Sequence, residues 1–314
     1  MRKLAIASAC LFTCAGAAAA APAAPAAPLP VVSIADQKPS VFSDARFRAL
    51  HVRRTRYVAP WNVALVARQR TRFEQWLIAA RAAGVREVLV AFSTASGSRC
   101  PKRPCVLPSQ RAYAHAFRSF HKRYPSIRLF QPWNEANSPT QPTAPWRNGA
   151  RAAALYYNVV KRYCKRCTVT GADVLDLSRR TMVRWLGQFR RYANGRPLLW
   201  GLHNYTDTNR HSGMTRWFLR QVPGKVWLTE TGGIVYFRRA SGAVNLTYNE
   251  HRAARALKRG FTLARADRAR VKRIYLYQWS IDFSGNRFDA GLVRADGKPR
   301  PGYWVVKRYR SWIR

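Results

Sequence analysis

The chain has 314 residues and carries 56 Lys and Arg side chains against 14 Asp and Glu, a formal net charge of +42. Such an excess is typical of nucleic-acid-binding proteins, but here the arginines are spread over almost every predicted helix. The sequence contains no basic tail, zinc-finger spacing or RNP-like aromatic strand. We therefore expect no specific nucleic-acid partner, and interpret the charge as a solvated basic surface that can attract anionic cell-wall polymers non-specifically.

Residues 1–20 have the pattern of a secretory signal peptide, with a short basic start, an alanine-rich apolar stretch and small residues at Ala18 and Ala20. Residues 21–30 form a Pro/Ala-rich spacer. A membrane anchor is the alternative, but a spanning helix needs roughly 20 strongly apolar residues, and this stretch is mostly alanine. The sequence predicts a secreted or cell-wall-associated monomer without a membrane span, whose single domain covers residues 31–314.

Four cysteines follow the signal peptide, in two local pairs: Cys100 with Cys105, and Cys164 with Cys167. Two short-range disulfides are expected in an exported chain. A four-cysteine zinc site is the alternative. In the barrel described next, the first pair follows the third strand at the upper rim and the second precedes the fifth strand at the base. Ligands at opposite ends cannot share an ion, so we predict two disulfides.

Apolar strands alternate with amphipathic helices along the whole domain. On the helix after the fifth strand, Met182, Trp185, Leu186 and Phe189 share one face, and Leu155, Val159 and Tyr163 repeat at every fourth position on the helix before it. Eight such units predict an α/β fold, a (β/α)8 TIM barrel. A doubly wound sheet is the alternative, but its phosphate-binding loop is not visible after the first strand. The predicted strands are Val31–Ile34, Thr55–Ala59, Glu87–Phe92, Ile127–Trp133, Val169–Val174, Leu198–His203, Val226–Thr229 and Ile274–Trp279.

Two of the five glutamates end apolar strands. Glu135 follows the fourth strand and Glu230 the seventh, whereas Glu74 and Glu250 lie on predicted helices and Glu87 begins a strand at the base. Catalytic groups of a barrel lie at the C-terminal ends of its strands. The pattern therefore indicates that Glu135 and Glu230 form a catalytic pair.

Other polar and aromatic residues end neighbouring strands, and the combination resembles clan A of the glycoside hydrolases, which includes the family 5 cellulases and mannanases. That family carries Asn-Glu after strand four and a second glutamate after strand seven. It usually has a histidine after strand three, where this chain has Phe92-Ser93-Thr94, so a neighbouring clan A family fits as well. The matching positions are Arg56 on strand two, Asn134 and Glu135 after strand four, His203 and Tyr205 on strand six, Glu230 after strand seven, and Trp279 on strand eight.

The resemblance implies a retaining glycosidase that acts on a β-linked polysaccharide or oligosaccharide. Glu135 would be the acid/base and Glu230 the nucleophile, with carboxyl groups about 5–5.5 Å apart. Arg56 and the Tyr205 hydroxyl would stabilise the Glu230 carboxylate. Asn134 would bind the sugar 2-hydroxyl.

His203 would orient the acid/base or a substrate hydroxyl, or be a strand-end histidine bound by the backbone. Trp279 would form the floor beneath the reacting sugar, and Trp61 and Trp133 would extend it, although packing roles fit both equally well. We expect neither a metal nor an organic cofactor. The alternative from another functional class is a non-catalytic barrel that binds carbohydrate or cell wall.

Overall fold

The computed structural model describes residues 27–94, 105–281 and 287–313. The predicted signal peptide and residues 21–26 of the spacer lie outside these ranges. The predicted Cys100–Cys105 disulfide does too, because Cys100 lies outside them. No described helix combines the length and apolar character that a bilayer crossing requires.

Cys164 and Cys167 are joined by a disulfide, with their Cα atoms 5.3 Å apart. The bond links the end of helix α4 (Asn148–Tyr163) to the residue before strand β5 (Thr168–Val169), at the base of the sheet. His121 lies close enough to join both sulfurs in a metal site. Because the sulfurs are bonded to each other, they offer no thiolate to an ion.

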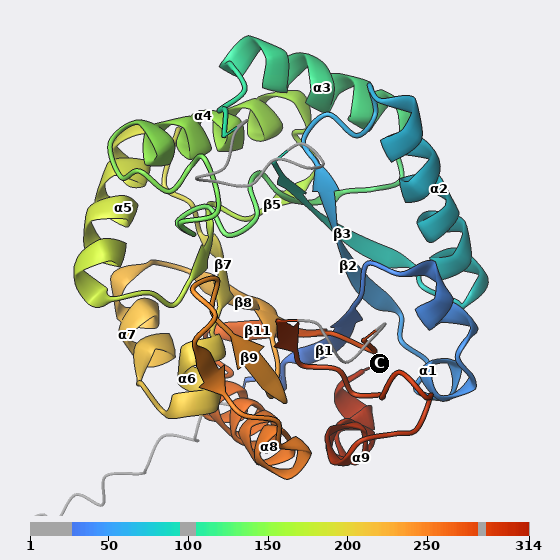
Figure 1. Cartoon of the computed structure of the whole chain (residues 1–314). Coiled ribbons are helices and arrows are strands. Elements are labelled where there is room, and N and C mark those ends of the chain that lie inside the picture. The colour runs from blue at the N-terminus through green and yellow to red at the C-terminus, as the bar shows by residue number, and fades with distance from the viewer. Residues whose placement is uncertain (1–26, 95–104, 282–286, 314) are drawn as a thin grey trace, which may run out of the picture.

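Parallel strands form a ring at the centre of the molecule, and helices surround it (Figure 1). Hydrogen bonds join the strands in two runs, β1-β11-β8-β7-β6 and β2-β3-β4-β5. The strands of the ring are β1 (Val31–Ala35), β2 (Arg54–Pro60), β3 (Glu87–Ser93), β4 (Leu129–Gln131), β5 (Thr168–Val169), β6 (Asp173–Leu175), β7 (Leu199–His203), β8 (Lys225–Thr231) and β11 (Val271–Tyr277).

The two runs meet at two places. At the first place, residues 170–172 interrupt the predicted fifth strand and separate β5 from β6. The Thr170 N–H donates to the carbonyl of Phe130 in β4 at 3.0 Å, and the Gly171 N–H donates to the carbonyl of Leu199 in β7 at 2.7 Å. On the other side, the Thr55 hydroxyl in β2 donates to the carbonyl of Ile34 in β1 at 2.7 Å. The predicted (β/α)8 arrangement is therefore the observed one, with β5 and β6 sharing one strand position.

The outer helices bury one face each against the ring. On α5, Met182, Trp185, Leu186 and Phe189 are all buried, as their spacing predicts. Burying a large apolar side chain contributes about 1.5–3 kcal/mol, so this face alone fixes the helix to the sheet. The helices are α1 (Ala45–Ala49), α2 (Ala67–Ala82), α3 (Gln110–Arg123), α4, α5 (Arg179–Tyr192), α6 (Tyr205–Arg210), α7 (Met214–Gln221), α8 (Glu250–Ala266) and α9 (Pro301–Arg308), with short 3-10 turns at Pro39–Ser43 and Arg310–Trp312.

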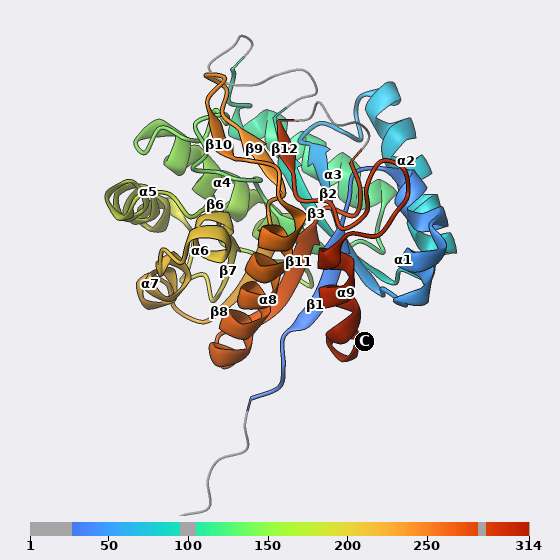
Figure 2. The ribbon, with the colours of Figure 1, turned by 60° about the horizontal axis from the view of Figure 1, so that its bottom comes forward.

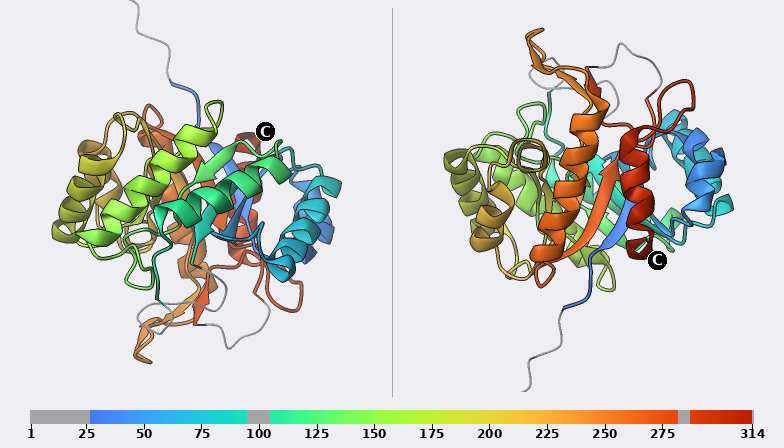
Figure 3. Two further views of the ribbon diagram at one scale, coloured as in Figure 1. Left: turned by 90° about the horizontal axis from the view of Figure 1, so that it is seen from above. Right: turned by 90° about the horizontal axis from the view of Figure 1, so that it is seen from below.

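The two ends of the ring differ. Strand β1 starts at one end, the base, and all strands run from there towards the other end (Figures 2 and 3). At that upper end stands a small antiparallel sheet in which β9 (Tyr236–Arg238) pairs with β10 (Val244–Leu246) and β12 (Phe288–Asp289). The C-terminal strand ends, where catalytic groups were predicted, therefore open beside this sheet.

Candidate active site

Arg56, in the middle of β2, is the centre of a buried polar cluster and has no exposed surface. Its Nη1 donates to Glu230 Oε2 at 2.8 Å, and its Nε donates to Gln131 Oε1 at 2.6 Å. Its Nη2 donates to Asn134 Oδ1 and lies 3.3 Å from Asp173 Oδ2. A buried charge is costly unless it is paired and hydrogen-bonded. These contacts satisfy Arg56, and at the same time fix side chains from three other strand positions, those of β4, β6 and β8.

Glu230 lies near the end of β8, and both of its carboxylate oxygens accept hydrogen bonds. Oε2 accepts from Arg56, and Oε1 accepts from the Tyr205 hydroxyl at 3.1 Å. Its side chain is 12% exposed. Two donors directed at one carboxylate suit an ionised, acceptor-only group.

Glu135 is placed by an unusual turn after β4. Its φ is +46°, a left-handed conformation that few residues other than glycine adopt. Two backbone hydrogen bonds hold the turn. The Asn134 N–H donates to the carbonyl of Phe92 at 2.6 Å, and the Ala136 N–H donates to the backbone carbonyl of Asp173 at 2.8 Å. The Glu135 side chain is 23% exposed, about twice as much as that of Glu230. Of the two predicted catalytic groups, Glu135 is therefore the more open to an incoming ligand.

The two carboxylates meet at His203, the last residue of β7. Its Nδ1 lies 3.2 Å from Glu135 Oε1 and 3.7 Å from Glu230 Oε2. One oxygen of each glutamate and a ring nitrogen of His203 all lie within 4.8 Å of one another. The separation of the two glutamate oxygens is close to the carboxyl distance of retaining glycosidases, about 5–5.5 Å, and shorter than the roughly 6.5–9.5 Å of inverting ones.

Asp173, at the start of β6, holds His203 from the other side. Its Oδ2 lies 3.0 Å from His203 Nε2, and both side chains are fully buried. Burial by itself would lower the pKa of His203, but the carboxylates of Asp173 and Glu230 outweigh it and raise that pKa to about 10. Burial would likewise raise the pKa of Asp173, yet His203 and Arg56 bring it down to about 2. The ring is therefore an imidazolium at neutral pH, with its Nδ1–H directed at Glu135.

The same charges decide whether the cluster suits a metal. Glu135, His203 and Glu230 are close enough together to offer three ligand atoms. A protonated imidazole has no free lone pair, and the Arg56 guanidinium already lies against Glu230. The chemistry of these donors therefore does not fit a cation.

Two predicted sugar-binding tryptophans pack elsewhere. Trp279 is 1% exposed, donates from Nε1 to Asp44 at 3.0 Å, and meets the Phe47 ring edge-on. Trp133 is 2% exposed and stacks on Tyr156 with ring centroids 5.2 Å apart. Neither indole has an open face, so the predicted sugar-platform role does not fit Trp133 or Trp279.

Trp61 differs from these two tryptophans, because its side chain is only half-buried. It follows the end of β2, where its backbone N–H donates to Ser93 of β3 at 2.9 Å. It is therefore the one predicted platform residue that keeps accessible surface at the upper rim.

Three residues of the cluster were missed by the sequence analysis: Gln131, Asp173 and Tyr277. The first two are polar residues within apolar strands, which is a usable signal. Tyr277 ends β11, and its carbonyl lies 3.5 Å from the Tyr205 hydroxyl. Burial first, and then the charge of Glu230, raise the pKa of the Tyr277 phenol. The strand-eight aromatic residue beside the carboxylates is therefore Tyr277, two positions before the predicted Trp279.

Comparison with solved structures finds proteins that share the fold of this chain. Xylanase B from Clostridium stercorarium F9 is 13% identical, with a TM-score of 0.64, and the match covers 88% of this chain and 96% of that one. A β-glucosidase from Thermotoga maritima is 13% identical, with a TM-score of 0.57 and 85% of each chain covered. The chain has the barrel fold of these glycoside hydrolases. The shared fold is what such low identities establish.

A family 39 glycoside hydrolase from Bacteroides cellulosilyticus WH2 is also similar, at 15% identity and a TM-score of 0.55. The match covers 88% of this chain but 62% of the other, so this chain spans less than two thirds of that protein's length. No protein-family model matches the sequence, and no curated protein does.

Proposed function

We propose that the protein is a retaining glycoside hydrolase in which Glu135 is the acid/base and Glu230 the nucleophile. The observation that carries the proposal is the approach of one oxygen of each glutamate to within 4.8 Å of the other at the end of a barrel. One anomeric carbon and its glycosidic oxygen can lie between two carboxyl groups at that separation.

In the first step, the Glu135 carboxyl group gives its proton to the glycosidic oxygen, and the leaving sugar departs as an alcohol. A Glu230 oxygen forms a bond to the anomeric carbon as the old carbon–oxygen bond breaks. In the second step, Glu135 takes a proton from water, whose oxygen bonds to the anomeric carbon and releases Glu230. Two inversions leave the product with the starting configuration.

The surrounding side chains are suited to these steps. Arg56 and Tyr205 hold both Glu230 oxygens, which orients the nucleophile. The Asn134 Oδ1 accepts from Arg56, which fixes the amide and leaves its N–H groups as donors for a sugar hydroxyl. The His203 imidazolium donates to Glu135 and favours the anion that Glu135 becomes after it has given up its proton.

We further propose that the substrate is a β-linked polysaccharide or oligosaccharide and that the protein acts after secretion. Similar structures include a xylanase and a β-glucosidase, and the name of the second refers to a β-linked sugar. The signal-peptide pattern of residues 1–20 supports the location. A non-catalytic carbohydrate-binding barrel would need none of the directed hydrogen bonds to Glu230.

The test compares the wild type with Glu230→Gly on a panel of aryl β-glycosides, xylan and β-glucans. We expect activity to fall by roughly 10⁴-fold or more, and azide to restore it by filling the space left by the carboxylate. Glu74→Gln is the control, because Glu74 lies on α2 outside the site and pairs with Arg123 at the end of α3. Equal activity in wild type and Glu230→Gly would refute the assignment, and saturable sugar binding without turnover in the wild type would favour the binding barrel.

A further inference from the structure

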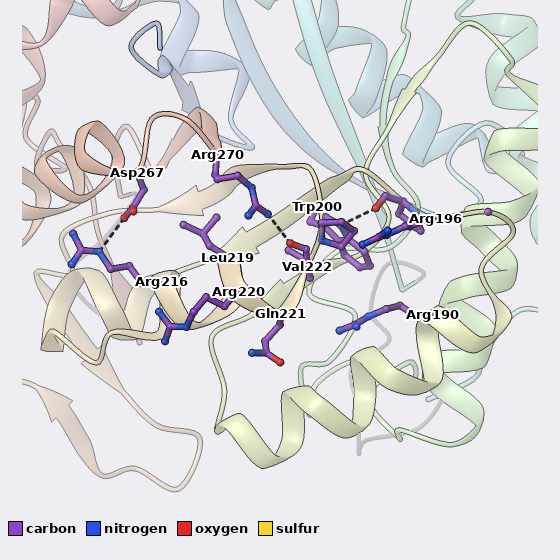
Figure 4. A pocket seen from close by; sticks show the side chains of 13 residues that line it. Arg190, Arg196, Trp200, Arg216, Leu219, Arg220, Gln221, Val222, Asp267 and Arg270 are labelled. Carbon is purple, nitrogen blue, oxygen red and sulfur yellow. Dashed lines mark hydrogen bonds and ion pairs between the residues drawn. The ribbon is translucent and has the colours of Figure 1, made fainter. Parts of the chain in front are cut away.

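A pocket of about 740 Å³ lies at the base of the barrel, at the end opposite to the two glutamates. Its walls come from the end of α5, the end of α7, and the turns before β7, β8 and β11, as Figure 4 shows. Trp200, Leu219 and Val222 supply apolar surface to the lining, and each is buried. The pocket is therefore built on helix ends and turns at the base of the barrel and is separate from the candidate active site.

Positive charge dominates the lining of this pocket. One acidic residue, Asp267, is engaged by Arg216 at 3.3 Å. Arg270 is directed at the backbone, where it donates to the carbonyls of Val222, at 2.6 Å, and Gly224. The five arginines of the lining are Arg190, Arg196, Arg216, Arg220 and Arg270.

The other three arginines, Arg190, Arg196 and Arg220, reach the pocket without a protein partner. No hydrogen bond or ion pair joins them to any residue in the ranges 27–94, 105–281 and 287–313. Partial burial lowers the pKa of Arg190, and no carboxylate offsets that effect. Three exposed arginines without a protein partner thus line one pocket, whose one carboxylate is already bound by Arg216.

These three arginines are exposed residues, whereas two arginines near Glu250 are paired with carboxylates. Arg300 is paired with Asp289 at 2.7 Å and lies 3.1 Å from Glu250, while Arg294 donates to the same Glu250 at 2.7 Å. The sequence has 14 acidic residues for 56 Lys and Arg side chains, so carboxylate partners are scarce throughout the chain. The excess of unpaired guanidinium groups in the basal pocket therefore leaves room for an external anion.

We propose that this basal pocket binds a compact anion that carries two or more phosphate groups. A guanidinium is a planar fork of donors that matches phosphate oxygens, and each phosphate offers several acceptors to more than one arginine. A lone carboxylate would pair with one fork and leave the others unmatched. The concave shape suits a compact ligand better than an extended nucleic-acid strand.

The test is calorimetric titration of the full chain with tripolyphosphate and, separately, with orthophosphate. We expect saturable one-to-one binding of tripolyphosphate, tighter than that of orthophosphate because several arginines act together. Arg196→Ala/Arg220→Ala should weaken tripolyphosphate binding about tenfold or more. The matched control, Arg180→Ala/Arg184→Ala, removes the same charge from exposed positions of α5 outside the pocket, and should change the affinity less than about twofold.

Equal losses in the two double variants would show diffuse attraction and overturn the proposal, as would the lack of a saturable isotherm in the wild type. A single-stranded oligonucleotide that binds through Arg196 and Arg220 where tripolyphosphate does not would also overturn it. Circular dichroism of both variants verifies that they are folded. Because the pocket is remote from Glu135 and Glu230, glycosidase assays report on the proposed function independently of this result.

Discussion

Replacing Asp173 by asparagine removes one carboxylate from the buried cluster while keeping the shape of the side chain. In the wild type, two cations, Arg56 and His203, lie between the buried carboxylates of Asp173 and Glu230. Removing one partner of a buried pair leaves an uncompensated charge, which costs about 3–5 kcal/mol. The rise of the His203 pKa from 6.5 to about 10 corresponds to at most about 5 kcal/mol, shared among its partners. The expected cost of removing Asp173 lies within this limit.

The loss should depend on pH. A group whose folded-state pKa is raised contributes stability that is fully present below its unfolded pKa and is lost as pH rises through the folded value. For His203 that window runs from 6.5 to about 10. Asp173 contributes above its unfolded pKa of 3.8 and loses its contribution as pH falls towards about 2. Asp173→Asn should therefore cost most between about pH 4 and 6.5, and progressively less towards pH 10.

The assay is urea denaturation of both proteins at about pH 6 and about pH 10.5, since urea, unlike guanidinium, does not screen charges. The control is Asp289→Asn, which breaks the buried pair with Arg300 but touches no histidine. We expect a similar loss in this control, with little change between the two pH values. A loss for Asp173→Asn below about 1 kcal/mol, or one equal at both pH values, would refute the charge assignment of the cluster.

Three further outcomes follow from the contacts described above. Tyr205→Phe removes the donor to Glu230 and should lower kcat about 10–100-fold with little change in Tm, measured at saturating aryl glycoside. Arg56→Lys cannot reproduce the forked contacts and should lower kcat at least about a hundredfold as well as Tm; unchanged kinetics would contradict the role of the fork. Burial raises the pKa of Asp176 to about 7, so the free energy of unfolding of the wild type falls as the pH rises from 3.8 to about 7. Asp176→Asn has no carboxyl group to ionise and should avoid that fall. Above pH 7, its free energy of unfolding in urea should exceed that of the wild type by an amount on the order of 2 kcal/mol. A variant that shows no gain at high pH would contradict the assigned burial cost.

Much of the fold could be predicted because its signals are local. Continuous apolar runs placed the strands, and the apolar face of α5 is buried as its spacing indicates. Strand ends were less predictable. The predicted Ile127–Trp133 is observed as Leu129–Gln131, and it ends at Gln131 because Pro132 has no N–H to donate to a ladder. Helix spacing also misled in one place, because Tyr163 at the end of α4 is 37% exposed while smaller residues of α4 are buried.

The candidate site was predictable as a set of strand ends but not as a geometry. Glu135 and Glu230 stood out because carboxylates are scarce and both follow apolar strands. Asp173 lies inside a predicted strand. Its role depends on its contact with His203, thirty positions later in the chain. The direction of a strand-end side chain depends on tertiary packing, which explains why Tyr277, and not Trp279, borders the carboxylates.

The most direct measurement of the central idea is the configuration of the first sugar released. Proton NMR during rapid turnover of an aryl β-glycoside separates the two anomers before they interconvert in water. Two carboxylates acting from opposite sides of one carbon at the observed spacing predict that the β-anomer appears first and the α-anomer later. Initial release of the α-anomer would contradict double displacement at Glu230, whatever the overall rate.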